Sequence, residues 1–130
     1  MEFSNRQFAD VVVARPVGRI DHAAAAPLEK QLTPLVERAG AGKGALVLDF
    51  TDVEYISSVG LRVLMIAAKS MRTHERPIAV AALQPVVAEI FSISRFDKVL
   101  SVFPTVRSAL EEMSAAALVE FDATNAPGAL

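Results

Sequence analysis

Apolar residues along this chain recur with two different periods, and the changes between these periods mark the expected elements. Apolar runs typical of strands lie at residues 10–20, 45–50, 76–83 and 100–103. Elsewhere apolar residues recur every three or four positions, which predicts helices over residues 23–38, 58–73, 84–93 and 105–113. The alternation predicts an α/β fold with a mixed β-sheet, central parallel strands, an antiparallel edge from the first region, and about four helices.

Prolines, glycines and polar residues set the expected boundaries of these elements. Pro16 lacks a backbone donor, which predicts an edge, a bulge or an early strand end at this position. Pro34 predicts a kink in the first helix, and the glycine-rich segment 40–44 predicts that this helix stops before a short loop. Residues 51–55 are expected to form a polar turn.

The length and the end of the pattern predict the domain organisation. The chain has 130 residues, which suits one domain with a core that needs no metal or disulfide. The periodic pattern ends at Met113, so we expect a single domain over residues 1–113. Residues 114–130 are rich in alanine and contain Pro127 and Gly128, which predicts a loose C-terminal tail with at most a turn of helix around residues 118–121.

Composition narrows the classes of function. The formal net charge of −2 argues against a basic face for nucleic acid or a membrane surface. The absence of cysteine excludes disulfides, thiolate metal sites and a cysteine nucleophile. No apolar stretch approaches 18 residues and the N-terminus lacks a secretory pattern, which predicts a cytoplasmic protein without membrane insertion. His22 and His74 lie far apart, without an acidic pair at ligand spacing, so we expect no metal site.

The start of the helix at residues 58–73 carries the candidate chemistry. Ser57 and Ser58 precede an apolar stripe expected to face the core, formed by Leu61, Leu64, Met65 and Ala68. A serine at this position is a preferred N-cap, because its oxygen accepts a hydrogen bond from a free amide of the first turn.

Two features go beyond a simple cap. Gly60 lies in the first turn, where alanine would favour the helix by about 1 kcal/mol, so we expect something to approach the backbone closely there. A second apolar stripe, Val59, Val63 and Ile66, runs beside Arg62. Either the helix is buried on every side, or it offers one side to a partner protein.

The segment LVLDFTDVEYISSVGLRVLMIAAKSM, together with GRID at residues 18–21 and PIAVAAL downstream, resembles the STAS domain of bacterial anti-sigma factor antagonists. The resemblance extends from about Phe8 to Met113 and is strongest in the order strand, turn, serine, glycine, helix.

The resemblance implies a protein without catalysis or cofactor that works by partner switching, as a monomer or weak dimer. Unphosphorylated, it would bind an anti-sigma factor that is also a serine kinase, and thereby free the sigma factor. Phosphorylation of Ser58, with Ser57 as the second candidate, would release it, and a serine phosphatase would reset it. The expected partner-binding residues are Asp21, Ser57, Val59, Gly60, Arg62, Val63 and Ile66, although Asp21 alternatively caps a helix and Arg62 alternatively is a solvated surface charge.

Two other functions remain as alternatives. The first is a STAS subunit that is never phosphorylated and docks on a transporter ATPase or a larger signalling assembly. The second is an enzyme with Ser58 as nucleophile, which needs a base in reach, and His22 and His74 are the only histidines.

Overall fold

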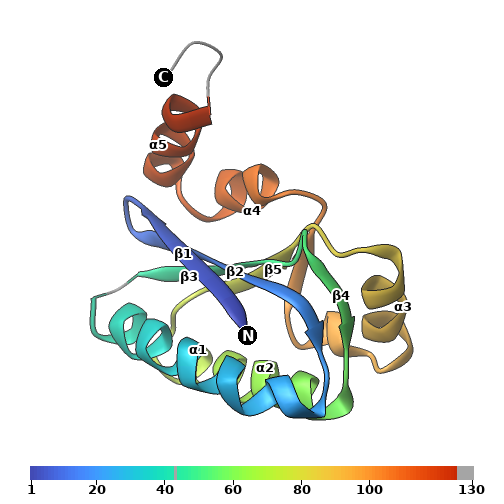
Figure 1. Cartoon of the computed structure of the whole chain (residues 1–130). Helices are drawn as coiled ribbons and strands as arrows, with labels where there is room; N and C mark the ends of the chain where they lie inside the picture. The colour runs from blue at the N-terminus through green and yellow to red at the C-terminus, as the bar shows by residue number, and fades with distance from the viewer. Residues whose placement is uncertain (43, 126–130) are drawn as a thin grey trace.

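The computed structural model describes residues 1–42 and 44–125 and holds a six-stranded mixed sheet with helices on both faces (Figure 1). The strands are β1 (Glu2–Phe8), β2 (Val11–Ile20), β3 (Ala45–Asp49), β4 (Val53–Ile56), β5 (Ile78–Ala81) and β6 (Ser101–Phe103). The helices are α1 (His22–Gly42), α2 (Ser58–Thr73), α3 (Pro85–Ile93), the 3-10 turn η1 (Phe96–Lys98), α4 (Val106–Met113) and α5 (Ala115–Asn125). The predicted α/β fold class with central parallel strands is confirmed.

The sheet has the order β1-β2-β3-β5-β6, and β4 pairs with β2 beside this path. Among the pairings of the described strands, β1 with β2 is antiparallel and the other four are parallel. The antiparallel edge is therefore Glu2–Phe8, a strand that the sequence pattern did not reveal, and the predicted first strand is its neighbour β2.

Two apolar layers enclose the sheet, because alternate residues of its central strands point to opposite faces. Leu46 and Leu48 of β3 join the core under α1, α2 and α3, whereas Ala45 and Val47 join a second core under α4 and α5. Burial on both faces explains the continuous apolar run of this strand.

Pro16 lies where β2 exchanges one neighbour for another. Residues 11–14 of β2 pair with β3, and residues 18–20 pair with β4, with a register shift at Gly18. Opposite Phe3 of β1, Pro16 thus occupies the gap between two ladders, where a missing donor costs little.

Three other boundaries differ from the expectation. Helix α1 continues through Gly40 to Gly42 rather than ending at residue 38. Residues 53–56 form β4 instead of a turn, because they find a ladder partner in the end of β2. Residues 115–125 form a helix that packs on β1 through Phe121 and Phe8, with ring centroids 5.4 Å apart, so the expectation of a loose tail is wrong for them. Residues 126–130 lie outside the described residues.

Candidate functional site

The register between β2 and β4 brings two helix N-termini together. Ile20 and Ile56 are paired at the carboxyl ends of these parallel strands, and the amide of Ser57 donates a 2.8 Å hydrogen bond to the carbonyl oxygen of Ile20. Helices α1 and α2 begin within two residues of this pair and pack side by side on one face of the sheet (Figure 1). The residues around both helix starts therefore form one surface.

Ser57 is the N-cap of α2, as the sequence predicted for a serine at this position. Its backbone is extended, and its hydroxyl oxygen accepts a 3.1 Å hydrogen bond from the amide of Gly60. The side chain is half-buried. This serine is therefore committed to holding the first turn of the helix.

Ser58 is the first residue of α2 and is exposed. No hydrogen bond of its hydroxyl occurs among the described residues. The hydroxyl at position 58 is open to solvent, and a visiting enzyme can reach it.

Gly60 is approached closely, as expected, but by the protein itself. A Cβ atom at this position would lie 2.7 Å from Cγ2 of Ile20 and 2.8 Å from Cγ1 of Ile56. Gly60 is buried, so it allows α2 to sit on the ends of β2 and β4. Its expected contact with a partner protein is replaced by this internal contact.

The second apolar stripe of α2 is divided between core and surface. Val63 is 6% exposed and belongs to the core, Val59 is half-buried, and Ile66 is 50% exposed. Met65, expected in the core, is exposed instead, because the helix is rotated so that Val63, Leu64, Ala67 and Ala68 face inward. The exposed part of the stripe is thus Ile66 with the neighbouring Arg62.

Asp21 caps helix α1 and borders the same surface. Its carboxylate accepts a 3.0 Å hydrogen bond from the amide of Ala24, which confirms the capping alternative. Asp21 is exposed and directly follows Ile20, the residue bonded to Ser57. Asp21 can therefore cap α1 and still contact a partner protein at the surface.

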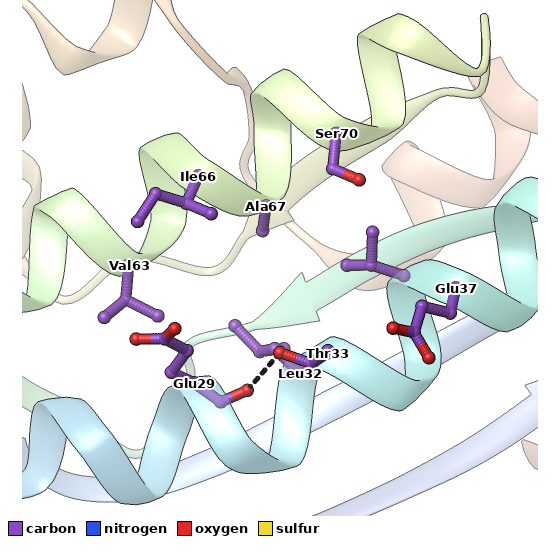
Figure 2. Close-up of a pocket in the computed structure, with 9 residues that line it drawn as sticks. Glu29, Leu32, Thr33, Glu37, Val63, Ile66, Ala67 and Ser70 are labelled. Atoms are coloured by element: carbon purple, nitrogen blue, oxygen red, sulfur yellow. Dashed lines mark hydrogen bonds between the residues drawn. The ribbon is translucent and has the colours of Figure 1, made fainter.

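A groove between α1 and α2 extends this surface along both helices (Figure 2). It has a volume of about 120 Å³ and a floor of Leu32, Val36, Val63 and Ala67. Glu29 and Glu37 stand on its α1 side and Ile66 and Ser70 on its α2 side. The sequence analysis did not single out the two glutamates, whose spacing of eight residues places them on one face of a helix.

The geometry gives no support to a serine nucleophile. His74 lies at the far end of the 16-residue helix α2, about 24 Å from its start at 1.5 Å per residue, and its ring bonds to the carbonyl of Ser70. No hydrogen bond between His22 and Ser58 occurs among the described residues. Within the same residues no cluster of three metal-binding side chains is present.

None of the helices in the described ranges has both the length and the apolar character that crossing a bilayer demands.

The STAS domain family matches residues 2–109 of the chain. This match covers most of the sequence, and the chain belongs to the STAS domain family.

Among known relatives, the chain is similar to BtrV of Bordetella bronchiseptica, a protein named as an anti-sigma factor antagonist. The two are 35% identical over 117 residues, which cover 90% of this chain and 94% of BtrV. STAS proteins of this kind are regulatory binding proteins.

Solved structures of anti-sigma factor antagonists have the same fold as this chain. An anti-sigma factor antagonist from Mycobacterium paratuberculosis has a TM-score of 0.74 and 26% identity, covering 86% of this chain and 94% of its own. Unphosphorylated SpoIIAA, an anti-sigma factor antagonist, shares the fold with a TM-score of 0.68 and 16% identity, covering 85% of this chain and 95% of its own. The Bacillus protein SpoIIAA has also been solved in its phosphorylated form.

Proposed function

We propose that this protein is an anti-sigma factor antagonist that acts by partner switching, with Ser58 as the phosphorylated residue. Unphosphorylated, it binds an anti-sigma factor that is also a serine kinase. Phosphorylation of Ser58 breaks the complex, and a serine phosphatase restores the binding form. The relationship to BtrV supports the general role, and the existence of SpoIIAA in two phosphorylation states supports a switch of this kind.

One observation carries the choice of serine. Ser57 and Ser58 are adjacent, but the Ser57 hydroxyl is bonded to the amide of Gly60, whereas Ser58 is exposed. A kinase that used Ser57 would have to reach a half-buried side chain that is held by this hydrogen bond. Modification of Ser58 leaves the cap in place.

The physical consequences of phosphorylation favour a switch over unfolding. A phosphate adds about −1.5 to −2 charges at neutral pH, and the start of a helix tolerates this charge because of its free amides and dipole. At an interface the same charge must lose its water. A cost of about 3 kcal/mol weakens binding by roughly two orders of magnitude.

The docking surface we propose consists of Asp21, Ser58, Arg62, Ile66 and the exposed edge of Val59. Arg62 and Ile66 follow the serine along the outer side of α2. The groove beside Ile66 continues the surface, and its two glutamates favour a partner that carries basic side chains there. Gly60 and Val63 support this surface from beneath.

The test is a kinase and binding experiment with ATP and candidate anti-sigma factor kinases from the same organism. We expect the mass of one phosphate on the wild type and on Val119→Ala, a far-surface control on α5, and none on Ser58→Ala. Ser58→Asp and Ile66→Asp should bind the unreacted kinase at least about tenfold more weakly than wild type. Phosphate on Ser58→Ala would assign the site to another residue, and binding without any phosphorylation would favour the docking subunit.

A further inference from the structure

Strand β1 exposes a long backbone edge. It has seven residues and pairs with β2 in unbroken register from Glu2 to Phe8. On its other side no strand follows among the described residues. The side chains of Ser4 to Gln7 are exposed, so nothing in the described structure covers the centre of this edge.

The two edges of the sheet differ in their protection. Strand β6, at the opposite edge, has only three residues, and short edge strands pair poorly with other chains. Strand β1 is longer and contains neither proline nor an irregularity in its register. These are the properties of an edge that pairs with another strand.

The sequence of β1 is complementary to itself. In an antiparallel pair centred on Ser4, Glu2 of one copy lies directly opposite Arg6 of the other, and this pair occurs twice. Phe3 then lies opposite Asn5. Directly opposed residues of opposite charge stabilise an antiparallel pair. If the register shifts by one pair, Arg6 lies opposite Ser4 in one direction, and Glu2 lies opposite Ser4 in the other. Neither shifted register places Glu2 opposite Arg6.

The side chains of Glu2 and Arg6 are both exposed, and the Arg6 guanidinium lies 5.2 Å from the centroid of the Phe8 ring. No ion pair between described residues includes Glu2 or Arg6. Arg15 lies opposite Ser4 on β2 and interacts electrostatically with Glu2, but it already forms an ion pair with Asp52. That hydrogen bond also raises the pKa of Arg15.

We propose that β1 pairs with β1 of a second copy of this chain, forming a homodimer with one continuous sheet. Opposed residues of an antiparallel pair lie on the same face, so the two-fold axis is perpendicular to the sheet. The α1 and α2 layers of both copies then share one face of the dimer. Ser58 lies on that layer rather than on the edge, so both sites remain accessible.

Three variants of the full chain test this pairing by sedimentation equilibrium. The wild type should shift from 13.9 kDa toward twice this mass as its concentration rises. Glu2→Arg and Arg6→Glu should each weaken dimerisation by about tenfold or more, because both opposed pairs become repulsive. The double variant Glu2→Arg/Arg6→Glu should return to within about threefold of wild type.

Mixing the two single variants gives a result that a general loss of structure cannot produce. One variant presents two arginines and the other two glutamates, so an equimolar mixture should form heterodimers while each alone remains monomeric. Val102→Lys, on β6, is the control and should dimerise as wild type does. A wild type that is monomeric up to about 1 mM, or a dimer indifferent to these changes, would overturn the proposal.

Discussion

The amide of Gly60 donates a hydrogen bond to the hydroxyl oxygen of Ser57 over 3.1 Å, and this contact separates the roles of two adjacent serines. Ser57 secures the first turn of α2, which leaves the neighbouring Ser58 hydroxyl exposed. Of these two serines, Ser58 is the one whose side chain is exposed and takes no part in the helix cap.

Exchanging each serine for alanine should separate the two roles. Ser57→Ala should lower the free energy of unfolding by about 1 kcal/mol, because an orphan amide loses its acceptor. Ser58→Ala should change it by less than about 0.5 kcal/mol. Urea denaturation followed by circular dichroism measures both values, and equal losses would show that the serines share the cap.

Ser58→Asp should melt close to the wild-type temperature. A negative charge in the first turn is favourable to the helix dipole by about 0.3–1 kcal/mol at low salt, and the side chain is exposed. Differential scanning calorimetry gives the comparison. A large drop in melting temperature would mean that the serine is structural and that loss of binding in this variant reflects unfolding.

Gly60→Ala should destabilise the protein by about 1–3 kcal/mol despite the higher helix propensity of alanine. The new methyl group would lie 2.7 Å from the side chain of Ile20. Gly42→Ala is the matched control, since no atom lies within 4 Å of a Cβ added there. If both variants are as stable as wild type in chemical denaturation, the contact with Ile20 is not restrictive.

Val63→Ala and Ile66→Ala compare the inner and outer sides of α2. We expect Val63→Ala to cost about 1–3 kcal/mol through a cavity in the core, whereas Ile66→Ala should cost less than about 0.5 kcal/mol because its side chain is 50% exposed. Isothermal titration with the anti-sigma factor partner should show the converse order, with the larger loss of affinity for Ile66→Ala. Matching losses of stability would place Ile66 in the core.

Helix α5 should contribute to the stability of the folded unit. Phe121→Ala should lower the free energy of unfolding by about 1–2 kcal/mol, because it removes the edge-to-face contact with Phe8. Val119→Ala, on the same helix but 68% exposed, should have almost no effect. Hydrogen exchange along residues 115–125 gives an independent measurement, and exchange as fast as in an unfolded peptide would contradict a docked helix.

Much of the fold follows from local patterns. The α2 and α3 helices and the β3 and β5 strands carry strong apolar periods, and α4 lies within the helix predicted over residues 105–113. The elements that were missed depend on distant residues. Five of the seven residues of strand β1 are polar and exposed, so its pairing with β2 rather than an apolar period makes it a strand.

In the candidate site, too, local patterns predict some features and contacts with distant residues determine the others. The apolar pattern indicates a helix beginning near Ser57, and it indicates two apolar stripes. It does not indicate how the helix is rotated, because Val63 and Met65 are both apolar and only packing on the sheet buries one and exposes the other. The two glutamates of the groove were missed because the groove exists only where α1 and α2 meet.

Arg107 of α4 donates two hydrogen bonds of 3.0 Å to the carboxylate of Asp122 on α5. Arg107 lies inside the family match, which ends at residue 109, whereas Asp122 lies beyond it. A protein shortened to the matched residues would stop inside α4 and lose this tether together with α5. Phe8 and the apolar layer around it would then face water, and molecules lacking their cover would adhere through that layer. Self-association observed with such a shortened protein would report the missing helix instead of the natural edge of the sheet.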